Sequence, residues 1–273
     1  KIKQVIGGVH ATLDSEILSR LRAIDYSIQR EGEIAMLRLV NGEPPENIQG
    51  VSSRNSNGIH ITGDAEVIAD IDLLPFPERN KFFGMTDEEK KTVDVSYICS
   101  IRGCPYRCNY CASPQHWKRD KTQYRSPESV INEMRYLKEN YWNTKKEYDF
   151  SASANIGPKQ DLKIKDNTIV YFVDDIFTVK KKRVKTILKM MIDQKLGMNW
   201  KCEARTDHLD EEICELMKKA GCSRVKLGFE SGSNRLLKNI QKDETKEDMK
   251  KIMRDSGKEN YGGIFNLNYS REI

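Results

Sequence analysis

The chain has 273 residues, enough for one large domain or two ordinary ones, and its apolar fraction of 38% is typical of a soluble globular protein. Its net charge of +5 arises from 46 Lys and Arg against 41 Asp and Glu, a balance that argues against nucleic acid as a partner. No apolar run approaches the roughly 20 residues that a membrane-spanning helix needs, so the composition excludes an integral membrane protein of that kind.

Seven cysteines occur without regular pairing or secretory context. This usage predicts a reduced compartment, the cytoplasm, and favours metal binding over disulfides. The chain also lacks a signal peptide and opens on Lys1 within an apparent strand. We therefore expect it to be a fragment of a longer protein.

The first 48 residues alternate short strands and helices. Residues 2–6 predict a strand that ends in a turn at Gly7 and Gly8, and residues 26–29 predict a second strand. Helices are expected over 14–22 and 34–40. This cadence is typical of the end of an α/β layer and is too short for a whole domain.

Residues 49–92 are predicted to connect this layer to the rest of the chain. An Asn57-Gly58 pair between two alternating runs predicts a hairpin over 49–63. The prolines of Leu73-Leu74-Pro75-Phe76-Pro77 exclude regular structure in the segment that follows.

Three cysteines then follow a strand predicted over 93–98, with the spacing C-x3-C-x2-C at Cys104, Cys108 and Cys111. Cysteines this close rarely share one face of regular structure, so a loop is expected to gather them. Thiolates that converge suit an iron–sulfur cluster or zinc. An odd number of ligands would leave one coordination position open to a small molecule.

Strand–helix units fill the remainder of the chain. Strands are predicted over 169–173, 199–203 and 224–229, and a further strand is due near 261–269. Ser126, Thr178, Asp210 and Thr245 are expected to cap helices, with Gly221 at a helix end. The run 180–183 is interpreted as a solvated helix face, and 143–167 as a surface insertion. Parallel strands with right-handed crossovers follow, although periodicity does not distinguish a closed barrel from an open sheet.

Polar residues follow the predicted strands at the point where each ends. They are the cysteine loop, Asp174 with Asp175, Arg205, and Glu230 with Ser231. Parallel α/β folds place their chemistry at this carboxyl edge, so the four positions together predict an active site there.

At this point the sequence resembles the radical S-adenosylmethionine (SAM) superfamily. The cysteine motif with Tyr110 before its last cysteine carries the resemblance. Five further stretches resemble the cobalamin-binding subgroup of this superfamily. They are Gly7-Gly8-Val9-His10, Glu31-Gly32-Glu33, the Leu-Pro-Phe-Pro connector, Phe172-Val173-Asp174-Asp175 and Gly228-Phe229-Glu230-Ser231. That subgroup includes methyltransferases and anaerobic magnesium-protoporphyrin ester cyclases. The implied fold is a partial TIM-like (β/α) barrel over 93–273, preceded by the C-terminal remnant of a Rossmann-like cobalamin-binding domain over 1–48.

The resemblance implies a [4Fe-4S] cluster on Cys104, Cys108 and Cys111, reductive cleavage of SAM to a 5′-deoxyadenosyl radical, and a small-molecule substrate. Tyr110 would lie beside the cluster and the adenine, and Asp174 and Asp175 would hold the SAM amino group, although many members carry Gly-Gly-Glu there. Arg205 would pair with the SAM carboxylate, and Glu230 and Ser231 with the ribose. Gly7 and Gly8 would contact cobalamin. A flavodoxin or ferredoxin would supply electrons, and the reaction would be methyl transfer or cyclisation.

Two alternatives remain open at this stage. Cys104, Cys108 and Cys111 with His116 would make a Cys3His structural zinc site without catalysis. Cys99 as a fourth ligand would instead close the cluster and leave an electron-transfer centre. Cys202, Cys214 and Cys222 are interpreted as buried apolar residues.

Overall fold

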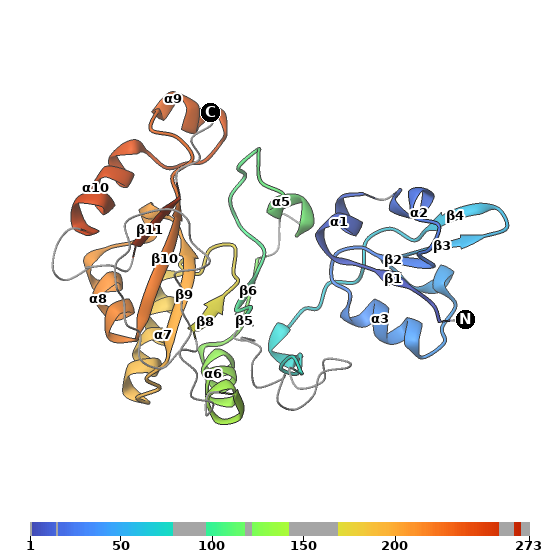
Figure 1. The fold of residues 1–273 in the computed structure, drawn as a ribbon, viewed down its shortest axis with the longest axis horizontal. Helices are drawn as coiled ribbons and strands as arrows, with labels where there is room; N and C mark the ends of the chain where they lie inside the picture. The colour runs from blue at the N-terminus through green and yellow to red at the C-terminus, as the bar shows by residue number, and fades with distance from the viewer. Residues whose placement is uncertain are drawn as a thin grey trace. The chain divides into compact units, whose positions relative to one another are not determined.

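The computed structural model describes residues 2–14, 16–78, 97–117, 122–141, 169–256 and 265–268. The chain forms two compact units, shown in Figure 1 and considered separately below. Unit 1 contains Lys1–Ile71 and Arg102–Gln123, and unit 2 contains Asp72–Ile101 and Tyr124–Ile273. The cysteine loop therefore belongs to unit 1.

Unit 1 is built on a four-stranded sheet in the order β1-β2-β3-β4. Strand β1 pairs parallel with β2, and the other two pairs are antiparallel. The strands are β1 (Val5–Ile6), β2 (Tyr26–Ile28), β3 (Val51–Asn55) and β4 (Gly58–Ile61). The predicted hairpin is thus confirmed as β3–β4. It extends the first sheet, and Gly50 before it has a φ of 86° and leaves no room for a Cβ beside Ala65.

Short helices accompany this sheet. They are α1 (Gly8–Leu13), α2 (Ile17–Arg20), α3 (Glu33–Val40), α5 (Ser113–His116) and the 3-10 turn η1 (Pro45–Asn47). The helix predicted over 14–22 is therefore present only as α2. Helix α1 was not predicted, because two glycines at its start give no side-chain cap and little helix propensity.

Unit 2 is built on a five-stranded sheet in the order β11-β10-β9-β8-β5, with every neighbouring pair parallel. The strands are β5 (Tyr97–Ile98), β8 (Ile169–Phe172), β9 (Asn199–Ala204), β10 (Cys222–Gly228) and β11 (Phe265–Asn268). Spatial order follows chain order, so the sheet winds in one direction as a (β/α) barrel does. The α/β fold class with a partial TIM-like barrel is confirmed, and β11 lies where a further strand was due.

The helices of unit 2 begin mostly where the sequence places a cap. They are α6 (Pro127–Tyr141), α7 (Lys181–Asp193), α8 (Glu211–Lys219), α9 (Asn234–Asn239) and α10 (Lys246–Ser256), with 3-10 turns η2 (Ile71–Leu73) and η4 (Thr206–His208). The Asp210 carboxylate accepts from Ile213 N at 2.9 Å, and Ser126 and Thr245 accept in the same way. Thr178 does not cap α7, since Lys180 occupies the capping position and the Thr178 hydroxyl lies 3.2 Å from His208 Nδ1.

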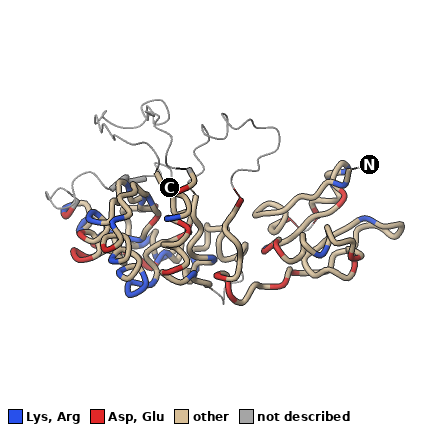
Figure 2. Tube along the Cα trace, turned by 90° about the horizontal axis from the view of Figure 1, so that it is seen from below, with Lys and Arg blue, Asp and Glu red and all other residues tan. Residues whose placement is uncertain are grey.

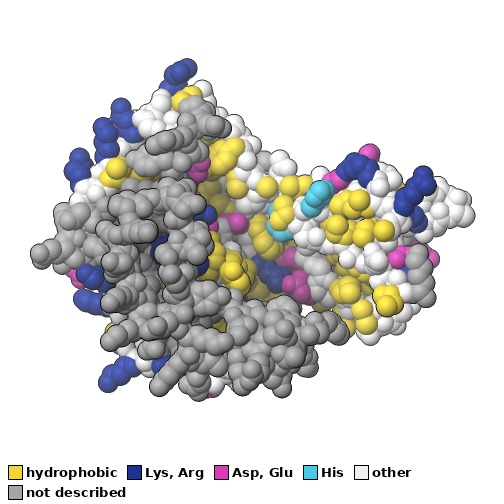
Figure 3. All heavy atoms as spheres, viewed as in Figure 1, with side chains coloured by type: hydrophobic (Ala, Val, Ile, Leu, Met, Phe, Trp, Pro, Cys, Tyr) yellow, Lys and Arg dark blue, Asp and Glu magenta, His cyan; other side chains and the backbone are white. Residues whose placement is uncertain are grey.

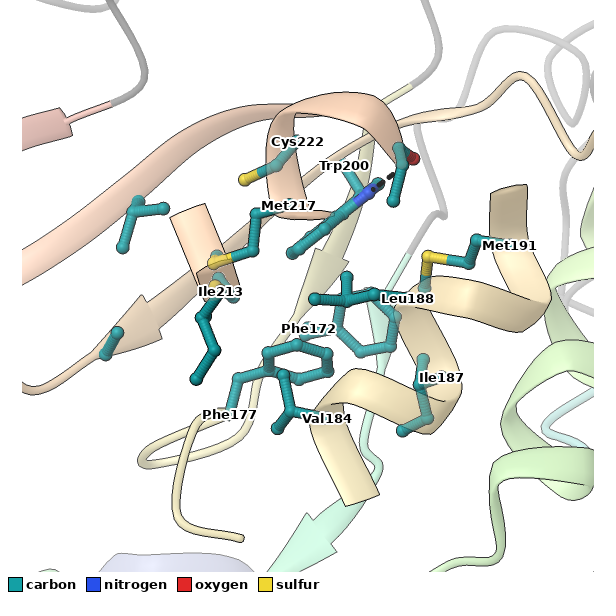
Figure 4. Close-up of a cluster of buried hydrophobic side chains, with 14 of the residues drawn as sticks. Phe172, Phe177, Val184, Ile187, Leu188, Met191, Trp200, Ile213, Met217 and Cys222 are labelled. Carbon is teal, nitrogen blue, oxygen red and sulfur yellow. Dashed lines mark hydrogen bonds between the residues drawn. The ribbon is translucent and has the colours of Figure 1, made fainter. Parts of the chain in front are cut away.

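The core of unit 2 lies between the sheet and its helices (Figure 4). Phe172, Phe177 and Trp200 pack with ring centroids 4.7–5.6 Å apart. The Trp200 indole also donates to Ala220 O at 2.9 Å, shown as a dashed line. Alternate residues of β8, β9 and β10 are buried in this core, which leaves their other face to polar side chains.

Short strands β6 (Ile101–Arg102) and β7 (Gln123–Tyr124) form a two-stranded sheet at either end of the cysteine loop. Charges of both signs are interspersed along the chain, as Figure 2 shows. Among the described residues, none of the helices is long and apolar enough to cross a membrane. The predicted insertion 143–167 and residues 93–96 of the predicted strand lie outside the described ranges.

Candidate active site

The cysteine loop begins after β6 with Gly103, whose φ of 94° turns the chain where most side chains would be strained. Cys104, Cys108 and Cys111 are partly exposed residues, and none of the three forms a disulfide. Within the loop, Cys111 N donates to Cys108 O at 3.2 Å, and Ser113 N, at the start of α5, donates to Cys111 Sγ at 3.4 Å. The thiolate is the form of cysteine that binds a metal.

Both ends of this loop are held within unit 1 by the turn before α3. Arg102, two residues before Cys104, pairs with Glu33 and lies 3.7 Å from Glu31. At the other end, Arg30 has a φ of 62° and donates from Nη1 to the carbonyl oxygens of Gln115 and His116 at 3.0 and 3.1 Å. The Glu31-Gly32-Glu33 motif thus contributes to the anchoring of the loop.

The remaining predicted residues of the loop take distinct positions. Tyr110 is 51% exposed, so its ring is available to a ligand. The His116 ring lies edge-on to Trp117 with centroids 4.7 Å apart. Cys99 lies before the loop in unit 2, and its thiol donates to Ile101 O at 3.2 Å.

The donor chemistry of the loop fits an iron–sulfur cluster, since three cysteines outside any disulfide lie in one irregular segment anchored at both ends. Within the described parts of the chain, no three His, Cys, Asp or Glu side chains form a group that could hold a metal ion. The ligands of a single metal ion meet at about 2.0–2.3 Å from one point. Cluster ligands bind separate irons and need no such common point.

In unit 2, Asp174 follows β8 and is only 2% exposed. Its Oδ1 accepts from Ser100 N at 2.6 Å and from Ile101 N at 2.9 Å, and its Oδ2 accepts from the Ser100 hydroxyl at 2.5 Å. Burial raises the pKa of this carboxyl to about 6, although these hydrogen bonds and Arg183 favour the charged form. Asp175, the next residue, is exposed. The two aspartates, for which the sequence predicts one shared role, therefore lie in different surroundings.

Arg205 follows β9 and is also buried, at 5% exposure. Its guanidinium forms a two-point contact with Asp207, at 3.0 and 2.9 Å, and donates to the carbonyl oxygens of Lys242 and Asp243. Glu244 lies beside it and accepts from both the amide and the hydroxyl of Thr206. Arg205 thus ties the end of β9 to the loop before α10.

Glu230 and Ser231 follow β10 in a half-buried turn. Glu230 has a φ of 55°, and its carboxylate lies 3.6 Å from the ammonium of Lys242. A Cβ at Gly228 would lie 2.6 Å from Glu230 Oε1, so a larger residue at 228 would displace this carboxylate. Ser231 Oγ accepts from Ser233 N at 3.2 Å. Lys242, which the sequence did not single out, is buried next to both Glu230 and Glu244.

The sheet face opposite the helices carries a second group that the sequence analysis missed. Tyr171 donates to Glu203 at 2.6 Å, and Lys226 donates to the same carboxylate oxygen at 3.0 Å. Lys201 lies 4.6 Å from the centre of the Tyr171 ring. Burial and the nearby Glu203 raise the pKa of Tyr171. Alternating burial along these strands was the available signal, since each polar residue lies between two buried ones.

Gly7 and Gly8 join β1 to α1 in unit 1. Gly7 is extended, with a φ of −144°, whereas Gly8 has a φ of 85° and open space where a Cβ would be. Both are exposed, so the backbone of this turn is accessible to a ligand.

Comparison with known proteins identifies relatives of the chain. A protein of Pyrococcus horikoshii described as an uncharacterized methyltransferase is 27% identical over 243 residues, covering 87% of this chain and 47% of that protein. The anaerobic magnesium-protoporphyrin IX monomethyl ester cyclase of Rubrivivax gelatinosus is 26% identical over 276 residues, covering 94% and 44%. The chain thus spans about half the length of these curated relatives.

Solved structures support the fold. The radical SAM methyltransferase TsrM from Kitasatospora setae, solved with cobalamin and a [4Fe-4S] cluster, superposes with a TM-score of 0.71 at 18% identity, covering 96% of this chain and 50% of that one. The cobalamin-dependent SAM radical enzyme OxsB gives 0.69 at 18% identity, covering 96% and 35%. The model of the Radical SAM superfamily matches residues 98–268, well over half of the sequence. The chain belongs to the radical SAM superfamily.

Proposed function

We propose that the chain is the catalytic part of a radical SAM enzyme in which Cys104, Cys108 and Cys111 hold a [4Fe-4S] cluster. The observation that carries this proposal is the anchored loop with three cysteines spaced C-x3-C-x2-C, in a chain whose residues 98–268 match the superfamily. A cluster bound there would supply the electron that cleaves SAM. The loop's own residues would orient the thiolates, with the Ser113 amide directed at Cys111 Sγ.

The exposed or half-buried polar residues are the best candidates for SAM contacts. Tyr110 offers an aromatic ring, Asp175 a carboxylate for the ammonium group, and Glu230 with Ser231 acceptors for the ribose hydroxyls. Asp174 and Arg205 were expected to share this role. Their hydrogen bonds to the protein's own backbone favour a positioning role for both.

The full-length protein would also bind cobalamin, with Gly7 and Gly8 among the contacts, and would catalyse methyl transfer or a cyclisation. The relatives in both categories and the cobalamin-dependent structures support this finer proposal. The substrate would be a small molecule that meets the polar sheet face around Glu203. Electrons would come from a flavodoxin or ferredoxin in an oxygen-poor cytoplasm.

Anaerobic reconstitution tests the cluster. Wild-type protein should acquire about four iron and four sulfide per chain with broad visible absorbance, and Cys108→Ala should lose most of this iron. Cys99→Ala and His116→Ala are the matched controls, because each removes the extra ligand of a competing site and should leave the iron content unchanged. A colourless wild-type protein that holds one zinc, lost in His116→Ala, would show that the proposal is wrong.

A second experiment tests the chemistry. The reconstituted protein, reduced with dithionite and supplied with SAM, should release 5′-deoxyadenosine, and Cys108→Ala should release none. An intact cluster that never yields 5′-deoxyadenosine, in this chain or in the full-length protein, would contradict the radical mechanism while leaving the cluster assignment in place.

A further inference from the structure

The segment that leads from β5 into the cysteine loop is fixed by side chains from two other parts of unit 2. From one side, Asp174 accepts from two successive amides, Ser100 N and Ile101 N, and from the Ser100 hydroxyl. Every oxygen of this carboxylate is therefore engaged by residues 100 and 101. Val173, the residue before Asp174, also donates from its amide to Ile98 O at 2.9 Å.

Arg183 holds the same segment from α7. Its Nη2 donates to Ser100 O at 3.0 Å, and its Nε donates to Arg125 O at 2.8 Å. The Arg125 amide donates to Ser100 O as well, at 3.0 Å, and the Arg125 side chain donates to Cys99 O at 3.3 Å. The run 180–183 was predicted to be a solvated helix face. That prediction is wrong for Arg183, which is partly buried and lies over the Tyr124 ring at 5.9 Å.

These contacts satisfy the N–H and the C=O of Ser100 and the N–H of Ile101 with side chains from outside the segment. A buried backbone group without a partner costs roughly 1–3 kcal/mol, so the segment is restrained strongly at this point. The carboxylate and guanidinium also compensate each other's charge across Ser100. Only Arg102 and Gly103 separate Ile101 from the first cysteine of the loop, Cys104.

We propose that Asp174 is a positioning residue that, together with Arg183, fixes Ser100 and Ile101 and so sets where the cluster-binding loop begins. This assignment rests on the proposed function only in taking the loop to bind a cluster. It removes Asp174 from the groups that contact SAM. To fix Ser100 and Ile101, residue 174 needs an acceptor oxygen of the right geometry. To bind the SAM ammonium it needs a negative charge, so a substitution can separate the two roles.

Two variants at one position make this separation. Asp174→Ala removes the acceptor and leaves two buried amides unpaired. Asp174→Asn is uncharged, but its Oδ1 can accept from both amides, and its Nδ2 can donate to the Ser100 hydroxyl. We expect Asp174→Ala to bind iron roughly 10-fold more weakly during reconstitution, within the range seen when groups that orient metal ligands are removed. Asp174→Asn should recover most of this affinity.

The affinity for SAM distinguishes a residue that contacts SAM from a residue that only positions the loop. The change that SAM causes in the electron paramagnetic resonance spectrum of the reduced cluster gives a Kd for the loaded fraction alone. That Kd should stay within about twofold of wild type in Asp174→Asn, since a twofold change corresponds to only about 0.4 kcal/mol. Asp193→Asn, an exposed aspartate at the end of α7, is the matched control for the substitution itself.

Three outcomes would overturn the assignment. If Asp174→Ala binds iron as tightly as wild type, Asp174 does not position the loop. A Kd for SAM raised 10-fold or more in Asp174→Asn, with unchanged iron, would make Asp174 a SAM ligand. If Asp174→Ala does not fold by circular dichroism, the milder Ser100→Ala and Arg183→Lys decide, and unchanged iron affinity in both would reject the proposal. A wild-type protein without a cluster refutes the proposed function instead.

Discussion

The two units of this protein bury their apolar residues to very different extents. Unit 2 has one continuous core, from β5 and α6 through to α10. Unit 1 has a small cluster of Ile28, Ala35, Ile48 and Val51, and it leaves large side chains such as Leu37 and Val40 at 58% and 70% exposure. Figure 3 shows hydrophobic side chains on the surface of both units. The cysteine loop thus belongs to the unit with the smaller core, where the hydrogen bonds of Arg30 and the ion pair of Arg102 do more of the anchoring.

The largest expected effect is in the core of unit 2. Trp200→Ala should lower the free energy of unfolding by about 3–5 kcal/mol, because it leaves a cavity between Phe172 and Phe177 and the Ala220 carbonyl without its donor. Chemical denaturation followed by circular dichroism measures this. Trp117→Ala in unit 1, at a partly exposed position, is the control and should cost much less. Equal losses in the two variants would contradict the contrast between the units.

The buried ion pairs of unit 2 come next. Arg205→Ala should lower the free energy of unfolding by about 3–4 kcal/mol. It leaves the carbonyl oxygens of Lys242 and Asp243 without a donor and removes a cation from beside Glu244. Arg224→Ala, an exposed arginine on β10, should change stability by less than about 0.5 kcal/mol. Denaturation midpoints compare the two. A loss below 1 kcal/mol at Arg205 would mean that the loop before α10 is held by other contacts.

Asp174 should give a pH-dependent contribution to stability. Its folded-state pKa of about 6 lies above the ordinary value of 3.8, so its contribution is fully present below about pH 4 and is lost as the pH rises through 6. Relative to Asp174→Asn, wild type should therefore lose up to about 3 kcal/mol between pH 4 and pH 7. Denaturation of both proteins across this range measures the difference, in which titrations common to both cancel. A difference that does not change with pH would show that the carboxyl titrates normally.

The smallest expected effect is in unit 1. Ile48→Val removes one methyl group from a fully buried side chain and should cost about 1 kcal/mol. Hydrogen exchange is the suitable measurement, because the loss should appear as faster exchange in β1–β4 and leave β8–β10 unchanged. If the wild-type amides of β1–β4 exchange more slowly than those of β8–β10, unit 1 is the more stable unit and the contrast between the two cores is wrong.

Features fixed by local chemistry could be predicted from the sequence. The capping residues Asp210 and Thr245 act through amides three positions away, and the strands of unit 2 alternate in burial as their apolar pattern indicates. The sequential order of parallel strands could not be read from periodicity. It depends on which strands pair, and residues far apart in the chain decide that.

The candidate site shows the same limit at the level of single residues. Asp174 and Asp175 are identical in type and adjacent, yet Asp174 is hydrogen-bonded to Ser100 and Ile101, 74 and 73 positions earlier, whereas Asp175 is exposed. Arg183 belongs to a basic run whose other members face solvent, and only the packing of α7 directs it inward. The sequence pattern predicts the carboxyl edge of the sheet. It does not distinguish the polar groups available to a ligand from those that form hydrogen bonds within the protein.

Unit 1 is assembled from two stretches of chain, with residues 72–101 of unit 2 between them. During synthesis on a ribosome, its sheet can form early, but Arg30, Glu31 and Glu33 must wait for the cysteine segment to emerge. By then β5 has been made but β8, its neighbour in the sheet, has not. The order of translation thus brings the cysteine segment to its partners in unit 1 before the sheet of unit 2 can be built.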